Sequence, residues 1–472
     1  MIRMALKDNL RIVIIIILFL VFNILLLNFH DVSWDSAVYV GMGKYLFSHG
    51  QAGLWEPIRP LILPIILGFF WKIGLNPLIS GEIFILLVSA SMIILTYILS
   101  KRLFGNNTAI ATSILVAFST LILKISHQIL VEILAVLFLL LGFYFYLSKK
   151  NFISGMVFGL AFLTKFPAVL FLIAIWLIET YYLFYKKSKF LKYFKKYLHL
   201  GIGFLLIIAP YFVFNYTVYN NILFPLKSAQ YVIDNVVGCN ILYKQPFYYY
   251  FPLIVKDNIL NVFFIFGMFS IFFNKNKIDK IQVLFYVLAL IIYLSNLSCK
   301  TERYPILALP FIAMIAGYGV IETFKGLGKK HIMVILIVVF AISISLAISY
   351  TARNLQKTRG NYEFHSYLSN KEIRDEVLTT TPVITIYINK KLNMIYYPLY
   401  NSSKIDYYSS YVSKNRNNIS YIVIDTEDIP CNPKDTECPK KTTQFINLLK
   451  NNFKLDYYKK INNKEQFIFS QQ

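Results

Sequence analysis

The feature that most constrains this chain is the recurrence of long apolar runs. An α-helix needs about 20 apolar residues to cross a bilayer, and eleven runs reach or approach that length. They lie at about 11–29, 79–100, 107–124, 127–147, 152–166, 168–185, 198–217, 251–273, 281–298, 303–323 and 331–350. Because 57% of the 472 residues are apolar, a soluble fold would have too little polar surface to cover them. The runs predict an all-α polytopic membrane protein with about eleven transmembrane helices.

Three of these segments need separate interpretation. The first run follows Arg3, Lys7 and Arg11, and no small-residue cleavage site follows it, which predicts a retained signal-anchor helix. The runs 152–166 and 168–185 form either two helices or one bent helix. The segment 59–74 is short and contains two prolines, so we expect a helix in the membrane interface or a partly re-entrant one.

Basic residues between the runs predict the orientation of the chain. Cytoplasmic connections are enriched in Lys and Arg, and every second connection here is basic if the N-terminus is cytoplasmic. These connections contain Lys101, Arg102, Lys149, Lys150, Lys186, Lys187, Lys189, Lys192, Lys195, Lys196, Lys275, Lys277, Lys280, Lys325, Lys329 and Lys330. The net charge of +23 is therefore attributed to membrane orientation rather than to nucleic-acid binding. The tail from about 351 is then extracytoplasmic.

The same orientation places all four cysteines, Cys239, Cys299, Cys431 and Cys438, outside the reducing cytosol, where disulfides are permitted. Cys431 and Cys438 lie in CNPKDTEC, and either close a small loop or remain two thiols. The cysteines lack the spacing of a zinc site, and nothing resembles a nucleotide-binding glycine loop. We expect no cofactor and no bound metal.

The division into domains follows from a change in composition near residue 350. Residues 1–350 form the predicted transmembrane domain, and residues 351–472, which are more polar, form a predicted small α/β domain on the outer face. Within it, Val383–Ile388 and Tyr421–Ile424 are predicted strands. Glu372–Leu378 and Thr443–Asn451 are predicted helices.

The stretch Trp34–Pro64 is the first polar segment after the first helix, and it contains the first candidate acid. Asp35 precedes Tyr39 by one helical turn, so both share a face if the segment is helical. Asp35 is either a functional carboxylate or, like Ser33, the cap of a helix over 36–48. Ionisable groups at membrane depth are costly and tend to be functional. Glu132 is the second such acid, either functional or a structural partner of Lys124 or His127.

Cations accompany these acids on the same predicted side. A cationic cluster near the membrane surface suits an anionic lipid head group such as a phosphate. Interfacial snorkelling is the alternative, and it is the preferred interpretation for Lys72 and Lys227. For Arg303 the alternative is a salt bridge to Glu302, and His127 is more often an interfacial histidine than a base. The outer-side cations are Arg59, Lys165, Lys227, Lys300 and Arg303.

Several segments together resemble the GT-C superfamily of membrane glycosyltransferases, in particular the protein O-mannosyltransferase and lipid A aminoarabinose transferase group. The likeness extends over about residues 10–325, in order. The matching segments are WDSAVY (34–39), IRPLILP (58–64), FFWKIG (69–74), LSKRLFG (99–105), VEILAVLFLLL (131–141), GLAFLTKFP (159–167), NYTVYNNILFP (215–225) and ERYPILALP (302–310).

The resemblance implies a site and a chemistry. The donor would be a polyprenyl-phosphate sugar, the acceptor a hydroxyl or amine on a protein, lipid or glycan, and the transfer inverting and metal-independent. Asp35 corresponds to the family's catalytic acid or base, and because Ser36 stands where a second acid is common, Glu132 takes that role. We expect these acids and cations to face one outer cavity. The donor phosphate is assigned to Lys165, Lys300, Arg303 and Arg59, and substrate contacts to Tyr39, Tyr304 and His127.

Two other functions remain open. A transporter or flippase also has many helices and intramembrane charges, but it predicts inverted repeats and broken helix pairs, which the sequence does not show. The second alternative is a non-catalytic protein of the same fold that only binds the lipid carrier. The missing second acid slightly favours this alternative.

Overall fold

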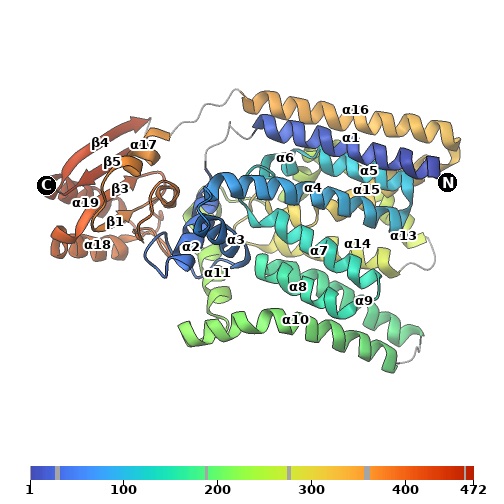
Figure 1. Ribbon diagram of the computed structural model, residues 1–472, viewed down its shortest axis with the longest axis horizontal. Helices are drawn as coiled ribbons and strands as arrows, with labels where there is room; N and C mark the ends of the chain where they lie inside the picture. Colours follow the sequence, from blue (N-terminus) through green and yellow to red (C-terminus); the bar gives the residue numbers. More distant parts are fainter. Residues whose placement is uncertain are drawn as a thin grey trace. The chain divides into compact units, whose positions relative to one another are not determined.

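The computed structural model describes residues 2–26, 32–186, 190–273, 278–355, 362–461 and 464–471 (Figure 1). The chain divides into two compact units. The first, the helical unit, consists of Met1–His30, Glu82–Leu223 and Pro246–Lys357, and the second, the mixed unit, of Asp31–Gly81, Phe224–Gln245 and Thr358–Gln472. The predicted boundary at residue 350 stays a prediction, but the tail shares its compact unit with two loops from earlier in the chain. Lys187, Lys189, Lys275, Lys277 and residues 27–29 of the first predicted run lie outside the described residues.

The helical unit is built from helices at every predicted run. Long apolar segments form helices because this satisfies every backbone hydrogen bond within the segment. The helices are α1 (Ile2–Leu26), α4 (Pro77–Phe104), α5 (Asn106–Ala117), α6 (Thr120–Ile125), α7 (Val131–Leu147), α8 (Asn151–Thr164), α9 (Val169–Lys186), α10 (Phe190–Tyr219), α12 (Tyr250–Asp257), α13 (Phe264–Phe273), α14 (Ile278–Asn296), α15 (Leu309–Thr323) and α16 (Gly328–Leu355). The predicted membrane-helix architecture is confirmed.

Several predicted runs are broken where a polar residue interrupts them. Run 107–124 divides into α5 and α6, because the Ser119 side chain caps the second helix by accepting the Ile122 N–H. Run 251–273 bends by 117° between α12 and α13. Lys165 has an extended backbone and separates α8 from α9, so 152–166 and 168–185 are two helices. Among the described residues, five helices are long and apolar enough to cross a membrane alone, or six with the bent pair.

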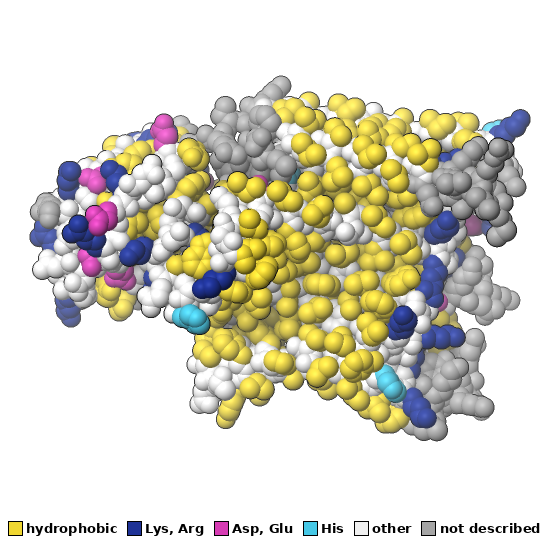
Figure 2. All heavy atoms as spheres, viewed as in Figure 1, with side chains coloured by type: hydrophobic (Ala, Val, Ile, Leu, Met, Phe, Trp, Pro, Cys, Tyr) yellow, Lys and Arg dark blue, Asp and Glu magenta, His cyan; other side chains and the backbone are white. Residues whose placement is uncertain are grey.

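The surface of the helical unit requires an apolar surrounding. Large apolar side chains such as Leu205, Ile337 and Phe272 are more than half exposed, at 59%, 61% and 62%. Figure 2 shows such side chains covering much of the visible face of the helices. A contiguous apolar surface of this kind marks contact with a membrane or a partner. Because these helices are long enough to cross a bilayer, contact with lipid explains the exposed apolar side chains.

The mixed unit contains a five-stranded sheet in the order β2-β1-β3-β5-β4. β1 is parallel to β2 and β3, whereas β5 is antiparallel to β3 and β4. The strands are β1 (Glu376–Thr379), β2 (Leu392–Met394), β3 (Ile419–Asp425), β4 (Lys454–Ile461) and β5 (Lys464–Ser470), and the helices of the tail are α17 (Tyr362–Ser366), α18 (Ser402–Lys414) and α19 (Cys438–Asn452). The predicted small α/β domain is confirmed.

Two of the four predicted elements in the tail are wrong. Val383–Ile388 is not a strand, because Pro382 begins a short 3-10 helix, Pro382–Ile386, that the Thr381 side chain caps. Glu372–Leu378 is not a helix, because its apolar end forms the buried strand β1. The predicted strand Tyr421–Ile424 lies in β3, and the predicted helix Thr443–Asn451 lies in α19, so both are confirmed.

The two loop segments of the mixed unit add α2 (Trp34–Phe47), α3 (Ile62–Lys72) and α11 (Phe224–Asn235). α3 has 11 residues, too few for a crossing helix. Helices α2 and α3 touch backbone to backbone at Gly43 and Gly68. A Cβ on Gly43 would lie 2.6 Å from the Gly68 nitrogen, so a side chain at this position would force the two helices apart.

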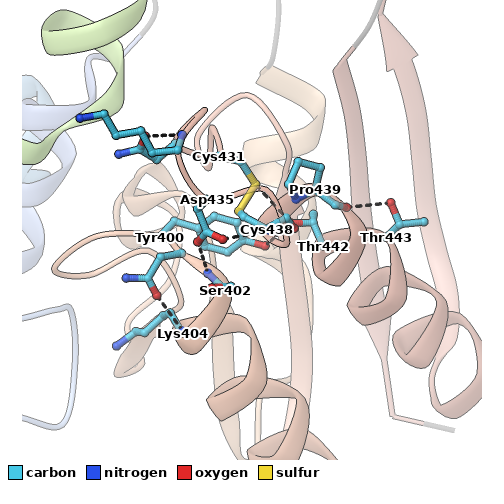
Figure 3. The surroundings of a disulfide bond; sticks show 12 residues. Tyr400, Ser402, Lys404, Cys431, Asp435, Cys438, Pro439, Thr442 and Thr443 are labelled. Carbon is cyan, nitrogen blue, oxygen red and sulfur yellow. Dashed lines mark hydrogen bonds between the residues drawn. A yellow bond between two sulfur atoms is a disulfide. The ribbon is translucent and has the colours of Figure 1, made fainter.

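The tail of the mixed unit contains the Cys431–Cys438 disulfide (Figure 3). Asp435, inside the eight-residue loop, accepts hydrogen bonds from the backbone N–H groups of Cys438, at 3.2 Å, and Ser402, at 2.8 Å. The loop is therefore fixed to the starts of α19 and α18. Of the two alternatives that the sequence left open for these cysteines, the structure contains the closed loop.

Candidate active site

Asp35 lies in the first turn of α2, and Ser33 caps this helix. The Ser33 hydroxyl accepts the Ser36 N–H at 3.2 Å, as an N-cap residue does. Of the two residues proposed as the N-cap, Ser33 therefore has this role and Asp35 does not. The Asp35 carboxylate stands near the positive end of the helix dipole, and the residue is only 8% exposed.

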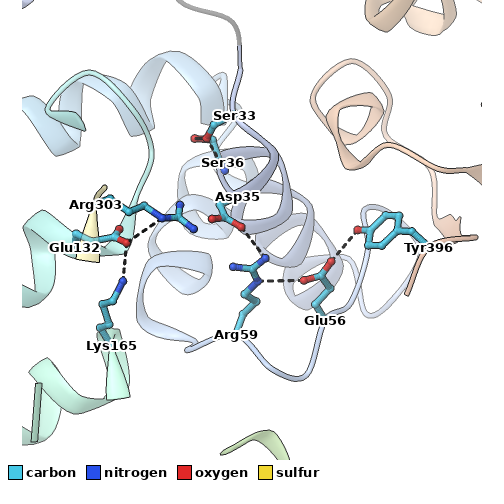
Figure 4. Close-up of polar contacts among 9 residues, drawn as sticks. All are labelled: Ser33, Asp35, Ser36, Glu56, Arg59, Glu132, Lys165, Arg303 and Tyr396. Atoms are coloured by element: carbon cyan, nitrogen blue, oxygen red, sulfur yellow. Dashed lines mark hydrogen bonds and ion pairs between the residues drawn. The ribbon is translucent and has the colours of Figure 1, made fainter. Parts of the chain in front are cut away.

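Arg59 joins Asp35 to a second carboxylate, Glu56. Its Nη2 lies 2.6 Å from Asp35 Oδ1, and its Nε lies 3.1 Å from Glu56 Oε2 (Figure 4). Glu56 and Arg59 are the first and last residues of a turn closed by the Arg59 N–H donating to the Glu56 carbonyl at 3.2 Å, and Pro57 occupies the second position, where proline is favoured. Burial alone would lower the pKa of Arg59, but Asp35 and Glu56 raise it well above its ordinary value.

Two tyrosines complete this group. The Arg59 guanidinium carbon lies 5.7 Å from the centre of the Tyr39 ring, a cation–π distance. Tyr39 and Asp35 thus share one face of α2, as predicted. Tyr396, from the tail, donates its hydroxyl to Glu56 Oε1 at 2.7 Å, and burial raises its pKa well above the ordinary value, so it remains a donor. Tyr396, Glu56, Arg59 and Asp35 form one chain of polar contacts.

The tail also fixes the position of α2. The buried ammonium group of Lys44 donates to the carbonyls of Thr385, at 2.6 Å, and Ile388, at 3.0 Å. Thr385 in turn donates its hydroxyl to the Ala37 carbonyl at 3.1 Å. The helix that carries Asp35 and Tyr39 is therefore anchored to residues 341 to 348 positions later in the chain.

A second group of charges lies within the helical unit, around Glu132. This acid is in the first turn of α7 and is 2% exposed. Lys165 Nζ lies 2.6 Å, and Arg303 Nε 3.5 Å, from the same oxygen, Glu132 Oε1 (Figure 4). Lys165 Nζ also lies 5.0 Å from the centre of the Tyr304 ring. Counted by themselves, these two cations and one carboxylate carry a formal charge of +1.

The structure corrects the partners assigned to three of these residues. Glu132 pairs with Lys165 and Arg303, not with Lys124 or His127. Lys124 instead pairs with Glu302 at 2.5 Å, so the alternative salt bridge between Arg303 and Glu302 is also wrong. The sequence suggested partners that are close along the chain. The true partners come together only in the folded protein, where the start of α7 meets the α8–α9 break and the turn that contains Arg303.

The remaining predicted site residues are placed as follows. Lys300 donates to the Leu297 carbonyl at 2.7 Å, in the loop that leads to Arg303. His127 is buried, at 4% exposure, in the turn before α7. In the parts of the chain that the structure describes, no group of three His, Cys, Asp or Glu side chains is arranged to hold a metal.

Sequence reasoning missed Glu56 and Tyr396 as members of the site. The spacing of Glu56 and Arg59 around Pro57 was a usable signal for their contact, since such a turn brings its ends together. Tyr396 carried no signal, because it lies 340 residues from its partner in a segment without a recognisable motif.

Known proteins are similar to this chain in overall fold and in part of the sequence. Residues 58–214 match the family model of the dolichyl-phosphate-mannose-protein mannosyltransferases. The structure is similar to ArnT from Cupriavidus metallidurans bound to undecaprenyl phosphate, with a TM-score of 0.70 and 12% identity over 98% of each chain. The apo state of ArnT from the same organism gives a TM-score of 0.66 and 12% identity over 98% of this chain and 97% of that one. No curated protein sequence gives a significant match.

These matches define the class of protein: a multi-pass membrane protein with the GT-C fold. The predicted resemblance to the GT-C membrane glycosyltransferases is thereby confirmed. More particularly, the chain is similar to the mannosyltransferase family over residues 58–214 and to ArnT in fold over nearly its whole length.

Proposed function

We propose that this protein transfers a sugar from a polyprenyl-phosphate donor to an acceptor hydroxyl or amine. The observation that carries the proposal is the Glu132–Lys165–Arg303 cluster, a net positive group at the ends of membrane helices. The fold supports it, since the similar ArnT structure is bound to undecaprenyl phosphate. The family matched by residues 58–214 is named for a dolichyl-phosphate sugar donor.

Lys165 and Arg303 are the proposed ligands of the donor phosphate. Glu132 holds both side chains by one oxygen, which orders them before the donor arrives and lowers the entropy cost of binding. A guanidinium and an ammonium suit the oxygens of a phosphate diester. Lys300, which lies in the same loop as Arg303, is proposed to add a third cation.

Asp35 is the proposed group that acts on the acceptor. The acceptor oxygen or nitrogen attacks the anomeric carbon and forms the new glycosidic bond, while the bond from that carbon to the phosphate oxygen breaks, with inversion. Asp35 orients the acceptor and takes its proton. The lipid phosphate leaves as an anion, so it requires charge stabilisation rather than a proton, which Lys165 and Arg303 supply.

Arg59 is better assigned to positioning Asp35 than to binding phosphate. Its guanidinium already contacts two carboxylates and lies over the Tyr39 ring. The contacts to Asp35 and Glu56 direct its donors toward protein oxygens, and Tyr39 is proposed to contact the acceptor beside it. Tyr304 and His127 remain proposed substrate contacts on the basis of the sequence.

We propose that the chain has a cytoplasmic N-terminus and an extracytoplasmic tail, where the acceptor is met. The alternation of basic connections supports this orientation. The Cys431–Cys438 disulfide supports it too, because disulfides persist in oxidising compartments and are rare in the cytosol.

The experiment is an assay of sugar transfer in proteoliposomes that contain a labelled polyprenyl-phosphate sugar and an acceptor extract. The wild-type protein should release the unlabelled lipid phosphate and label the acceptor, and Asp35→Asn should lose this activity while inserting normally. Asp406→Asn, the same change at an exposed acid of the mixed unit, is the control and should retain it. Full transfer by Asp35→Asn would remove Asp35 from the mechanism.

The bent pair α12–α13 makes transport the second function to test. Broken helices are common at the binding sites of transporters, where they occur in repeated pairs, and among the described residues this bend is the one such break. The same proteoliposomes decide between the two functions. Donor movement between leaflets without acceptor labelling would indicate a flippase.

A further inference from the structure

The charge cluster around Glu132 lies at one end of the α7–α8 hairpin, and a second, distinct cluster lies at the other. α7 starts beside Glu132 and ends before Lys149, and α8 starts after Lys150 and ends before Lys165. The 17 residues of α7, at about 1.5 Å each, separate the two ends by roughly 25 Å. This far end belongs to the helical unit and has no part in the proposed transfer.

A cavity of about 880 Å³ opens at this far end. It lies where the α7–α8 connection meets the N-terminal part of α10 and the start of α14. Its polar lining is mainly basic, and apolar side chains form the rest. The residues that line it are Lys149, Lys150, Asn151, Phe152, Ile153, Glu179, Lys195, Lys196, His199 and Ile278.

One side of the cavity is fixed by a buried polar network. Lys196 forms an ion pair with Glu179, which is 3% exposed, and its Nζ lies 4.1 Å from the centre of the Tyr146 ring. Tyr146 donates its hydroxyl to Glu179 and accepts a hydrogen bond of 2.9 Å from Gln282. Glu179 therefore neutralises Lys196 and holds it in place.

The other three lysines of the cavity are accessible. Lys149, Lys150 and Lys195 are exposed, and none of them forms an ion pair with a carboxylate in the described part of the chain. By formal charge, the four lysines and one glutamate of the lining sum to +3. A ligand that fits this charge is an anion.

The apolar lining decides which kind of anion. Phe152 and Ile153 are 38% and 41% exposed beside the lysines. An inorganic anion would gain nothing from these side chains, whereas the glycerol backbone and first methylenes of a lipid would cover them. Lysines at the end of a membrane helix usually only fix orientation, but here they surround a cavity with an apolar wall.

We propose that this cavity binds the phosphate head group of an anionic phospholipid from the adjacent leaflet, which is the cytoplasmic one in the orientation proposed above. Lys149, Lys150 and Lys195 contact the phosphate, Lys196 and Glu179 form the fixed floor, and Phe152 and Ile153 contact the upper acyl chain. Binding of the lipid would link the α7–α8 hairpin to α10 at the end of the hairpin opposite the Glu132 cluster.

The test measures the affinity of the purified full-length protein for phosphatidylglycerol, added to nanodiscs of phosphatidylcholine and detected by native mass spectrometry. The triple variant Lys149→Gln, Lys150→Gln, Lys195→Gln should bind it at least fivefold more weakly. A charge-matched control, Lys101→Gln, Lys325→Gln, Lys330→Gln, removes three positive charges that do not line the cavity and should bind as the wild type does. Thermal unfolding in pure phosphatidylcholine should be the same for all three proteins.

Two results would overturn the proposal. Equal loss of affinity in both triple variants would indicate diffuse attraction to the whole basic face. Displacement of the lipid from the wild type by inorganic phosphate at millimolar concentration would indicate a site for a free anion. If the triple variant fails to fold, Lys195→Gln alone serves, with Lys330→Gln as its control. The readout is lipid affinity, so it is independent of sugar transfer.

Discussion

Lys165 and Glu132 are 33 residues apart in the sequence, yet Lys165 Nζ lies 2.6 Å from Glu132 Oε1. The contact exists because α8 stops at Thr164 and Lys165 takes an extended conformation, which returns its side chain to the first turn of α7. Arg303 reaches the same oxygen. We therefore propose that Glu132 orders two cations, whereas the resemblance to the GT-C family implied a catalytic role for it.

Replacing Lys165 by Met should weaken donor binding, because the cluster loses one of the two cations proposed to contact the phosphate. We expect roughly a tenfold loss of affinity, about 1.4 kcal/mol, with Lys165→Arg retaining more of it. The measurement is equilibrium binding of a polyprenyl phosphate to protein in detergent. Lys124→Met, which breaks the half-exposed pair with Glu302, is the control and should change affinity little. Unchanged donor binding in Lys165→Met would refute the phosphate assignment.

Removing the Tyr396 hydroxyl should lower the rate of transfer without changing donor affinity. Tyr396→Phe deletes the hydrogen bond to Glu56, which holds Arg59 and through it Asp35. We expect kcat to fall about threefold to tenfold, the range for one lost hydrogen bond of roughly 1 kcal/mol, while KM for the donor is unchanged. The measurement is a steady-state transfer assay.

A double-mutant cycle separates this positioning role from a loss of stability. In a Glu56→Gln background, Tyr396→Phe should have a smaller effect than in the wild type, because both changes disturb the same chain of contacts. Tyr407→Phe, at an exposed tyrosine of the same unit, should leave the rate unchanged. Fully additive effects of the two changes would mean that Tyr396 does not act through Glu56.

The elements that the sequence predicted correctly are those encoded locally. An apolar run of membrane length forms a helix whatever its neighbours are, and Asp35 and Tyr39 share a face because α-helical spacing requires it. The errors in the tail have a local cause as well. Val383–Ile388 has the composition of a strand, but Pro382 lacks a backbone N–H and begins a 3-10 helix instead.

The pairing of charges was not predictable, because it depends on which segments the fold brings together. The structural alternative for Glu132 was a pairing with Lys124 or His127, but this acid pairs with residues 33 and 171 positions later. Tyr396 reaches Glu56 across 340 residues. A single sequence does not show which distant residues are close in space. It therefore identified the types of residue in the candidate site but not their partners.

Breaking the Cys431–Cys438 disulfide should destabilise the tail without affecting insertion of the membrane helices. Closing an eight-residue loop reduces the entropy of the unfolded chain, and the chain-entropy relation gives about 2.5 kcal/mol. The double variant Cys431→Ser, Cys438→Ser should therefore show faster hydrogen exchange in α19, measured by mass spectrometry on the full chain. The Asp435 contacts to Ser402 and Cys438 remain in this variant. Unchanged protection of α19 would mean that these contacts alone hold the loop.

The stability of the tail should decrease as the pH rises from about 4 to about 7, because of Asp428. Burial, followed by repulsion from Asp425, raises the pKa of Asp428 from 3.8 to about 7. The folded tail therefore holds an extra proton on Asp428 between these two pH values, so the contribution of this group to stability is most favourable below pH 4 and falls until the group ionises near pH 7. Asp428→Asn, which cannot ionise, should remove this dependence and stabilise the tail at pH 8 by about 2 kcal/mol, after allowance for partial solvent screening. Hydrogen exchange in β3, compared between the wild type and the variant at each pH so that intrinsic rates cancel, measures the difference. Glu427→Gln, at the adjacent exposed acid, is the control, and an equal effect of both substitutions would show that net charge rather than the burial of Asp428 controls the pH dependence.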